Sequence, residues 1–338
     1  MLLKSLSRSI DYGTEKVITH MNKKTLLILD GHNIFIRSFS GLMRQDLRSP
    51  DGNGTWGVFG AFNTIASMIG KYEPTHVLLA FDHGRSSKRL AIDPDYKANR
   101  KRNEEKPKTP KDEAFSLEFK PQLNDFKILC SLNGIPWYSL DNTEADDIIA
   151  TAALGFHDIF DRVVIVSADH DLHQLVRPNI IVVKPNISYR DIDIEVFDME
   201  SVQHEWGVEP WRLPEIWALM GDKGDNVKGI PGIGPKKATK LIAEHKDLDT
   251  VLTLEEQRIM DNVDVVRKAY KLIKLDYDPE LPFPPLGDLQ FNPLRPDGDK
   301  EAVHELKSFF KVLGFNQIYE RWKNGSLWSF AKNFGRGL

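Results

Sequence analysis

The sequence predicts an α/β domain with a central, mostly parallel sheet flanked by helices. Three short runs, at residues 26–29, 77–81 and 163–166, are apolar throughout, which is typical of parallel strands buried on both faces. A helical pattern from Val58 to Ile69 would carry the chain from the first strand to the second. Acids closely follow each run, and they are expected to meet because parallel strands end at one edge of a sheet. These acids are Asp30, Asp82, Asp169 and Asp171.

A further acidic group begins a predicted helix at residues 143–154. The apolar residues recur with helical spacing, and Thr143 with Asp146 would form an N-terminal cap. Glu144, Asp146 and Asp147 place three carboxylates in four residues, which repel one another by roughly 1 kcal/mol per close pair in water. Taken alone, this stretch is explained equally well as a solvated acidic first turn that the helix dipole partly stabilises.

Taken together, the acids favour a different explanation. Carboxylates that gather without basic partners in their own motifs repel one another unless cations hold them together. Oxygen ligands of this kind suit Mg²⁺ or Mn²⁺, and carboxylate sites with two such ions suit the hydrolysis of phosphodiesters. The sequence therefore predicts a two-metal site at the edge of the sheet.

The composition is that of an ordinary globular protein. Its 338 residues allow one large domain or two modest ones, and a hydrophobic content of 41% is ample for a core. No apolar run approaches the roughly 18 residues that span a membrane. The single cysteine, Cys130, excludes an internal disulfide and fits a reducing compartment, so we expect a cytoplasmic protein. For residues 1–24 we expect either a leader packed on the surface or a true start at Met21, rather than a transit peptide.

Charge is distributed unevenly along the chain. The net charge is −4, yet the segment from residue 85 to residue 111 carries ten Lys or Arg and four Asp or Glu. A basic segment beside an acidic cluster suits a polyanion that is bound at one place and cut at another. The span from His83 to about Lys120 is too long for an idle connector. Beside the acids, we favour a lid over the site rather than a disordered charged loop.

Candidate phosphate contacts lie within this basic segment. Asp93, followed by Pro94, predicts the start of a helix. Lys97 and Arg100 are three residues apart and would share one face of that helix. The adjacent Tyr96 would be able to stack on a base.

The region after the first strand is less specific. Gly31 lets the backbone turn close to a ligand. Arg37 lies seven residues past Asp30, about two helical turns on, and would either hold a phosphate or be an ordinary surface arginine. His32 is expected to be a hydrogen-bonded spacer rather than a ligand.

The second half of the chain contains a glycine-rich motif. Asp222 and Asp225 lie on a turn that is either a plain Asx loop or, as we favour near such a site, part of a metal site. Gly232 and Gly234 precede Pro235 and a helical run, which predicts a tight hairpin between two helices with amides suited to a phosphate. Lysines around the hairpin would add contacts that are independent of base sequence. They are Lys228, Lys236, Lys237 and Lys240.

The remaining pattern continues the alternation of strands and helices and then becomes rich in proline. Residues around Phe309 and Phe310 in the last helices are expected to be core residues rather than a partner site. The predicted elements are a helix at 121–134, a short strand at 135–140, a helical turn at 172–176, a strand at 180–184, helix at 202–220 interrupted near Gly207 and Pro210, an extended segment from 279, and a helix pair at 301–322 broken near Gly314.

Together these motifs resemble the 5′-nuclease family, which includes the N-terminal domain of bacterial DNA polymerase I and the standalone flap endonucleases and 5′–3′ exonucleases of bacteriophages. The resemblance runs from residue 25 to residue 319, and no polymerase follows, so the chain resembles the standalone members. The motifs that carry it are Leu29-Asp-Gly31, Phe81-Asp82, Tyr96-Lys-Ala-Asn-Arg100, Glu144-Ala-Asp-Asp147, Ser167-Ala-Asp-His-Asp171, Gly221-Asp-Lys-Gly-Asp-Asn226 and the helix-hairpin-helix.

The resemblance implies a PIN-like 5′-nuclease fold with a helical arch, through which a 5′ single strand passes, and a helix-hairpin-helix subdomain. In this chain the arch would span about residues 85–120, within a nuclease core at 25–215. The helix-hairpin-helix subdomain would occupy residues 216–290, and residues 291–338 would be C-terminal helices that pack on the core.

The resemblance also implies a site with two divalent ions, Mg²⁺ or Mn²⁺. Lys97 and Arg100 would hold the scissile phosphate, with Arg37 as a further phosphate contact and Tyr96 as a stacking surface. The hairpin would bind K⁺ through backbone carbonyls at residues 227–233 and grip the downstream duplex. One metal would lie among Asp30, Asp82, Glu144, Asp146, Asp147 and Asp169, and the second would involve Asp169, Asp171, Asp222 and Asp225.

The resemblance implies hydrolysis of phosphodiesters at 5′ ends, flaps and junctions of DNA. RNA–DNA hybrids, from which RNA primers would be removed, are a further implied substrate. The resemblance also implies that the protein is a monomer that acts in replication and repair. Two rivals are a relative that binds branched DNA without cutting it, and a shorter PIN-type ribonuclease. The complete set of carboxylates argues against the first, and the hairpin argues against the second. A phosphatase built on Asp30 would need a second aspartate two residues on, and the sequence has His32 there.

Overall fold

The computed structural model describes residues 23–100, 110–187 and 192–329. The predicted leader therefore lies almost wholly outside the described residues, as does the part of the predicted arch at residues 101–109. Among the residues that are described, no helix is both long enough and apolar enough to cross a lipid bilayer.

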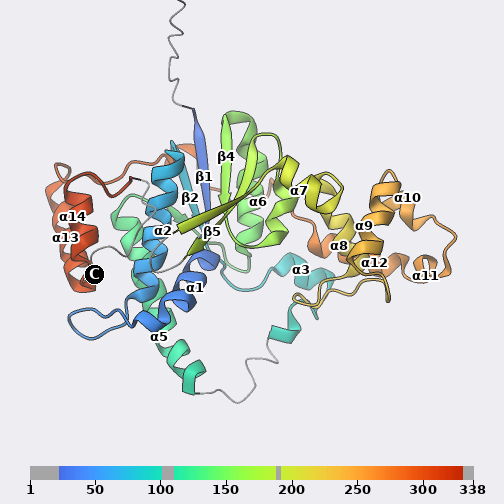
Figure 1. Cartoon of the computed structure of the whole chain (residues 1–338), viewed down its shortest axis with the longest axis horizontal. Coiled ribbons are helices and arrows are strands. Elements are labelled where there is room, and N and C mark those ends of the chain that lie inside the picture. Colours follow the sequence, from blue (N-terminus) through green and yellow to red (C-terminus); the bar gives the residue numbers. More distant parts are fainter. Residues whose placement is uncertain (1–22, 101–109, 188–191, 330–338) are drawn as a thin grey trace, which may run out of the picture.

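A six-stranded sheet lies at the centre of the fold, in the order β3-β2-β1-β4-β5-β6 (Figure 1). Neighbouring strands are parallel except β5 and β6, which pair antiparallel. The predicted mostly parallel α/β fold is confirmed. The strands are β1 (Thr25–Asp30), β2 (His76–Ala80), β3 (Trp137–Tyr138), β4 (Arg162–Val166), β5 (Ile180–Ile187) and β6 (Ile192–Phe197).

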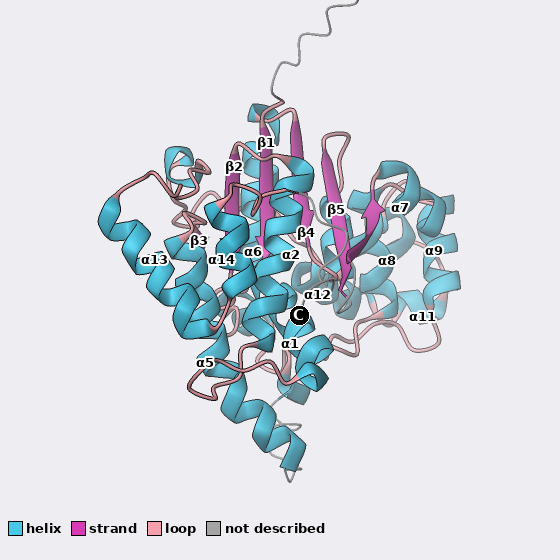
Figure 2. Cartoon of the chain, turned by 60° about the vertical axis from the view of Figure 1, so that its left-hand side comes forward, coloured by secondary structure: helices cyan, strands magenta, loops and turns pink. Residues whose placement is uncertain are grey.

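Helices cover both faces of the sheet (Figure 2). Alternate residues of β1 point to opposite faces, so Leu26 and Ile28 join one buried cluster whereas Leu27 and Leu29 join the other. Burial on both faces explains why the strand is apolar throughout. The first cluster includes α6, and the second includes α1 and α2. These helices are α1 (Gly31–Leu42), α2 (Trp56–Tyr72) and α6 (Ala145–Phe156).

Strand β6 is not among the predicted elements. It alternates Ile192, Ile194 and Val196 with polar residues, which is the pattern of a strand with one exposed face. Continuous apolar runs mark strands that are buried on both faces, and an antiparallel strand at the edge of the sheet has no such run.

Helix α5 (Pro110–Leu132) begins at Pro110, so the predicted start at residue 121 is wrong. Pro110 suits the first helical position, and acidic residues follow it in the first turn. Phe115 and Phe119 of α5 contact Phe39 of α1, with ring centroids 4.8 and 5.3 Å apart. This packing holds α5 against the helix that starts at Asp30.

The predicted helix start at Asp93 is also wrong. Asp93 instead ends α3 (Ser87–Ile92), and residues 94–97 form a turn. Lys97 has a φ of +55°, in the left-handed region that non-glycine residues seldom occupy. The chain therefore changes direction at Lys97 before it becomes helical again at residues 98–100.

A second group of helices follows the sheet in the sequence and lies to one side of it (Figure 1). The predicted interruption near Gly207 is confirmed, because Gly207 caps α7 with a φ of +69°. Residues 221–234 form the hairpin between α8 and α9. The helices are α7 (Met199–Trp206), α8 (Leu213–Met220), α9 (Pro235–Glu244), α10 (Leu248–Leu252), α11 (Gln257–Met260) and α12 (Val263–Ile273).

The hairpin is held by a close backbone crossing. A Cβ atom on Gly229 would lie 2.2 Å from the backbone nitrogen of Gly221, so neither of these two positions in the hairpin has room for a side chain. Gly221 also has a φ of +75°, which favours glycine. The backbone N–H of Ile230 donates to the carbonyl of Leu219 at 2.8 Å and fixes the loop on the end of α8.

The C-terminal helices α13 (Lys300–Leu313) and α14 (Asn316–Lys323) pack on the face of the sheet that α1 and α2 cover. Phe310, Leu313 and Trp322 join the buried cluster that contains α1 and α2. The break near Gly314 is confirmed, with Gly314 at a φ of +75°. Short 3₁₀ helices lie at Met43–Gln45, His157–Ile159, His170–Leu175, Pro210–Arg212 and Leu286–Leu289.

Candidate active site

Five of the nine predicted acids line a cavity of about 360 Å³ at the carboxyl ends of the central strands. Asp30 ends β1, and its side chain accepts the backbone N–H of Asn33 at 3.0 Å, which caps α1. Asp82 accepts the N–H of Ala145 at 2.8 Å and so holds the start of α6 against the end of β2. The carboxylates that line this cavity belong to Asp30, Asp82, Glu144, Asp146 and Asp169.

The cavity strongly disfavours isolated negative charge. Burial raises the pKa of Asp30 to about 7, and the charges of Asp82 and Asp169 add to this rise. Hydrogen bonds from Asn33 and from Ser167, whose hydroxyl donates at 2.8 Å, oppose it. Burial also raises the pKa of Asp146 well above its usual range, and the neighbouring aspartates raise it further.

A second acidic group lies beside the first. Asp171, Asp222 and Asp225 offer carboxylate oxygens that all lie within 4.8 Å of one another. Burial raises the pKa of Asp171 to about 7. The charge of Asp169 adds to this rise, and His170 opposes it.

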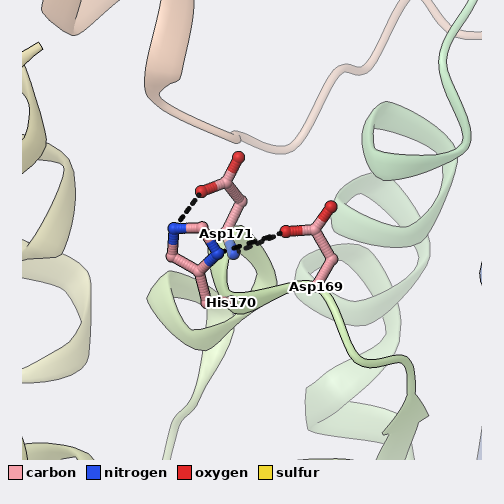
Figure 3. A group of neighbouring side chains, drawn as sticks. All are labelled: Asp169, His170 and Asp171. Carbon is pink, nitrogen blue, oxygen red and sulfur yellow. Dashed lines mark hydrogen bonds and ion pairs between the residues drawn. The ribbon is translucent and has the colours of Figure 1, made fainter. Parts of the chain in front are cut away.

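The two acidic groups are joined through η3 (His170–Leu175). Asp169 caps this element by accepting the N–H of Asp171 at 3.0 Å (Figure 3). The ring of His170 lies 3.8 Å from Asp169 and 3.4 Å from Asp171. Asp222 accepts the N–H of Gly224 at 2.7 Å, so the Asx loop is present, and Asp222 also belongs to the second acidic group.

The residues present fit divalent cations. The two groups supply carboxylate oxygens, which are the ligands that Mg²⁺ and Mn²⁺ favour. The pKa values of Asp30, Asp146 and Asp171 are raised first by burial and then by the charges of neighbouring aspartates, so nearby positive charge would stabilise their ionised forms. Two bound cations would supply that charge.

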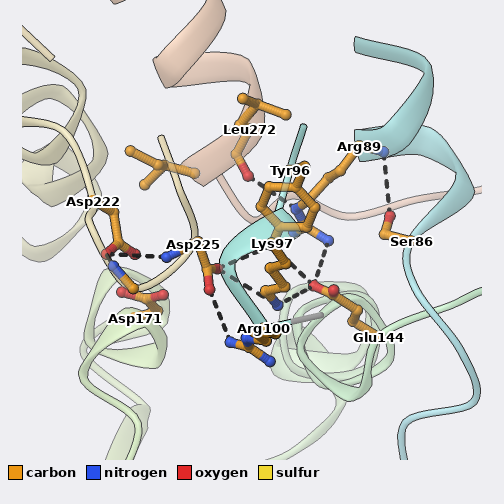
Figure 4. A network of polar contacts seen from close by, with 12 residues as sticks. Ser86, Arg89, Tyr96, Lys97, Arg100, Glu144, Asp171, Asp222, Asp225 and Leu272 are labelled. Carbon is orange, nitrogen blue, oxygen red and sulfur yellow. Dashed lines mark hydrogen bonds and ion pairs between the residues drawn. The ribbon is translucent and has the colours of Figure 1, made fainter. Parts of the chain in front are cut away.

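Lys97 and Arg100 bring positive charge to the rim of the cavity (Figure 4). The Lys97 side chain is 9% exposed, and its Nζ lies 2.8 Å from Glu144 and 3.5 Å from Asp225. Arg100 donates to the other oxygen of Asp225 at 2.8 Å. Both side chains reach the site because the turn at Lys97 directs the chain across it.

Tyr96 does not provide the predicted stacking surface. Its side chain is buried, with 3% of the residue exposed, and its hydroxyl lies 3.1 Å from Glu144 and 3.0 Å from Asp225. Tyr96 lies in the turn at residues 94–97 and not on the exposed face of a helix. The prediction is therefore wrong, and Tyr96 is a hydrogen-bonding core residue beside the site.

Asp147 is also placed differently from the prediction. It does not line the cavity that contains Asp146, because the two side chains leave different faces of the first turn of α6. Both oxygens of Asp147 instead accept hydrogen bonds from Arg89, at 2.7 and 2.9 Å. Arg89 was not among the predicted site residues, and the sequence distinguishes it from its basic neighbours by no local signal.

Arg37 lies outside the cavity that the acids line. Its guanidinium donates to the carbonyl of Pro185 at 3.2 Å, at the end of β5. His32 does line the cavity, with its ring 3.6 Å from Asp82. The predicted role of Arg37 as a phosphate contact stays a prediction.

The hairpin forms a separate cavity of about 680 Å³ next to the second acidic group, with Gly232 and Gly234 in its lining. Lys228, Lys236 and Lys240 are exposed around it. Lys237 pairs with Glu256 at 2.7 Å. The glycines leave the N-terminus of α9 open, where backbone N–H groups attract anions.

Comparison with known proteins agrees with this geometry. The family described as "5'-3' exonuclease, N-terminal resolvase-like domain" matches residues 25–207, and "5'-3' exonuclease, C-terminal SAM fold" matches residues 208–297. A 5′–3′ exonuclease of Aquifex aeolicus is 35% identical over 88% of this chain and 99% of its own length. DNA polymerase I of Bacillus caldotenax is 32% identical over 90% of this chain, which spans 33% of that longer protein.

Solved structures share the fold. The bacteriophage T5 flap endonuclease, in a pseudo-enzyme–product complex with DNA and metal ions, aligns over 90% of this chain and 98% of its own, with a TM-score of 0.64 and 18% identity. The T5 5′-exonuclease with bound zinc aligns over the same shares of both chains, with a TM-score of 0.63 and 19% identity. At this identity the likeness concerns the fold alone. The family matches and the curated relatives show that the chain is a nuclease that belongs to the 5′–3′ exonuclease family.

Proposed function

We propose that this nuclease hydrolyses phosphodiesters at 5′ ends, flaps and junctions of DNA during replication and repair. The observation that carries the proposal is the convergence of acids from three strand ends, a helix start and the hairpin loop beside Lys97 and Arg100. The relatives named as 5′–3′ exonuclease and DNA polymerase I support it, as does the T5 flap endonuclease bound to DNA and metal ions.

Two Mg²⁺ ions, or Mn²⁺ in their place, are the proposed cofactors. One ion would be held by the aspartates of the acidic cavity, with Glu144 near it: Asp30, Asp82, Asp146 and Asp169. The other ion would be held by the second acidic group, Asp171, Asp222 and Asp225. When bound, the ions would stabilise negative charge on the attacking oxygen and on the leaving oxygen of the phosphodiester.

The chain's own basic residues bind and orient the phosphate. Lys97 and Arg100 reach the cavity rim from one turn, so they can contact a phosphate that lies against the acidic groups. There they offset negative charge that develops on the phosphoryl group. Glu144 and Asp225 hold both side chains in place before DNA arrives, which reduces the reorganisation needed on binding.

The hairpin is the proposed grip on the downstream duplex. Exposed lysines and the amides near Gly232 and Gly234 would contact phosphates without reading bases. Carbonyls at residues 227–233 would hold a K⁺ ion at the same loop. Arg37 would add a phosphate contact near β5.

Loss of one hairpin phosphate contact should change the salt dependence of binding. Lys236→Ala is expected to reduce the slope of log Kd against log salt by about 0.9, the amount associated with one neutralised phosphate of duplex DNA. Fluorescence anisotropy of a labelled DNA duplex, with Ca²⁺ in place of Mg²⁺ so that the DNA is not cleaved, would measure Kd at each salt concentration. Lys307→Ala, on α13 away from the hairpin, is the matched control and should leave the slope unchanged. An unchanged slope for Lys236→Ala would remove this lysine from the interface.

One set of reactions tests the proposed function as a whole. A 5′-labelled flap, a nicked duplex and an RNA–DNA hybrid are each incubated with Mg²⁺ and with EDTA. We expect cleavage of the flap near its junction in Mg²⁺ and none in EDTA, because the carboxylates need cations to accept a phosphate beside them. Product lengths separate endonuclease from exonuclease action, and the hybrid tests primer removal.

The same reactions distinguish the rival functions. A protein that recognises branched DNA without cutting it would retard the flap in a gel and leave it intact in Mg²⁺. A PIN-type ribonuclease would cut the RNA strand without needing a 5′ end. The division into a core at 25–215, a hairpin subdomain at 216–290 and C-terminal helices at 291–338, the monomeric state and the cytoplasmic location remain proposals, the last supported by bacterial relatives.

A further inference from the structure

Arg89 joins three separate elements of the fold beneath the acidic cavity (Figure 4). Its two terminal nitrogens donate to the two oxygens of Asp147 at 2.7 and 2.9 Å. One of them also lies 3.3 Å from Glu144, and Nε donates to the carbonyl of Leu272 on α12 at 2.9 Å. Only 6% of Arg89 is exposed, so these contacts are protected from solvent.

These contacts fix the turn that carries Asp146. Glu144 and Asp147 lie on either side of Asp146 at the start of α6, and the guanidinium binds one oxygen of Glu144, which lines the cavity, and both oxygens of Asp147, which does not. A bidentate arginine–carboxylate pair fixes direction as well as distance. The position of Asp146 in the cavity therefore depends on the grip of Arg89 on its neighbours.

The same guanidinium also influences Lys97. Glu144 accepts hydrogen bonds from Arg89, Tyr96 and Lys97 on a single oxygen, so the three donors are arranged around one point. Arg89 lies 5.8 Å from the centre of the Tyr96 ring. Loss of the arginine would leave Glu144 held by Tyr96 and Lys97 from one side, and it would leave Asp147 without its buried cation.

Arg89 does not touch the space that the phosphate would occupy. With Asp147 it lines a different cavity, of about 540 Å³, whose other walls include Lys88, Tyr270 and Tyr277. Asp30, Asp82 and Asp169 line the acidic cavity instead. Arg89 itself is buried, but the Asp147 side chain is 25% exposed and borders this second cavity, which is large enough for a small cation.

We propose that Arg89 is a positioning residue for the nuclease reaction, and that Asp147 is its anchor rather than a metal ligand. The pair sets the direction of Asp146 and Glu144 and, through Glu144, the place of Lys97. This inference rests on the proposed nuclease function and adds to it the device that orients one side of the metal site.

A double-mutant cycle tests whether the two residues act as one unit. Arg89→Ala, Asp147→Asn and the double variant are compared in single-turnover cleavage of a 5′ flap at saturating Mg²⁺. Each single change is expected to lower the cleavage rate by about 10–100-fold, as for loss of a group that orients a ligand, with KM nearly unchanged. The double variant should be no slower than the slower single variant. Losses that multiply would overturn the proposal.

Metal titration separates an anchor from a ligand. Asp147→Asn is expected to reach its own, lower, maximal rate at a Mg²⁺ concentration close to the one that saturates the wild type. Asp146→Asn, the matched substitution on the cavity side of the same turn, should not be rescued by Mg²⁺. An Asp147→Asn variant that needs much more Mg²⁺ than the wild type would identify Asp147 as a ligand and overturn the proposal.

Chemical rescue uses the second cavity. Guanidinium ion, added well below the concentration that unfolds the protein, is expected to restore part of the rate of Arg89→Ala by entering beside Asp147. Arg321→Ala removes another partly buried arginine, which contacts Asn63 and Leu327, and should retain the wild-type rate with no response to guanidinium. A folded Arg89→Ala variant that guanidinium does not accelerate would count against the proposal.

Arg89→Lys keeps the inference testable if the alanine variant fails to fold. Lysine keeps the charge but lacks the planar fork, so a slow enzyme with a nearly unchanged melting temperature is expected. Wild-type turnover in this variant would overturn the positioning role. The wild-type enzyme is measured in the same assay. If the wild type is inactive, the proposed nuclease function fails; if the wild type and Arg89→Lys are equally active, only the positioning role of Arg89 fails.

Discussion

Asp146→Asn is expected to abolish cleavage of a 5′ flap in Mg²⁺ and to raise the melting temperature of the EDTA-treated protein. The amide offers a cation one neutral oxygen in place of a charged carboxylate, so the loss should exceed the roughly 100-fold that removal of an orienting partner costs. Burial and the charges of Asp169, Asp30 and Asp82 raise the pKa of Asp146, so the carboxyl destabilises the cation-free fold. Each kcal/mol relieved should raise the melting temperature by roughly 2–4 °C.

These two measurements are made on the same preparations. Single-turnover cleavage gives the activity, and thermal unfolding with EDTA and with Mg²⁺ gives the stability and the gain on cation binding. Asp158→Asn replaces an aspartate whose side chain is 92% exposed, and should leave both quantities unchanged. Near wild-type activity in Asp146→Asn would remove this residue from the metal site, and a lower melting temperature in EDTA would contradict the electrostatic argument.

The acids at the strand ends were predictable because topology alone brings them together. Asp30 and Asp82 follow apolar runs that have to be buried in one parallel sheet, and the paired strands end side by side. Asp146 was predictable as a site residue only together with its neighbours. The sequence shows three acids in one turn, and it does not show which of them faces the strand ends.

Asp147 illustrates what the sequence could not supply. Adjacent residues on a helix point in directions about 100° apart, so the neighbour of a cavity residue faces a different environment. Its partner, Arg89, is 58 residues earlier in the chain and lies in a segment where basic residues are common. Long-range pairs of this kind are fixed by packing between elements, and a local pattern carries no information about them.

The turn at Lys97 illustrates a second limit. Asp93 and Pro94 are ordinary signals for a helix start, and they predicted a helix with Lys97 and Arg100 on one face and Tyr96 next to them. The left-handed backbone of Lys97 overrides that signal, because its N–H donates to the carbonyl of Asp225 from the hairpin loop. Lysine rarely adopts this conformation, and here it depends on a contact with a residue 128 positions later in the chain. The local sequence therefore does not predict it.

Lys97→Ala is expected to lower turnover by about 10²–10³-fold, the range seen when one preorganised donor to a developing charge is lost. Binding of a 5′ flap should change little, because many other basic groups contact the phosphates. Single-turnover cleavage and anisotropy in Ca²⁺ measure the two effects separately. Lys88→Ala, which removes a 66% exposed lysine from the same basic segment, should leave turnover near that of the wild type.

The position of Lys97 also predicts how the variant responds to Mg²⁺. Its ammonium group lies between Glu144 and Asp225, at 2.8 and 3.5 Å, so it neutralises acids that border the metal site. Removing this charge leaves more negative charge at the site, so half-maximal activity should require less Mg²⁺ than in the wild type. Slow cleavage together with a lower Mg²⁺ requirement would show that Lys97 acts on the phosphate. Slow cleavage that excess Mg²⁺ restores would instead show that Lys97 only orders the metal ligands.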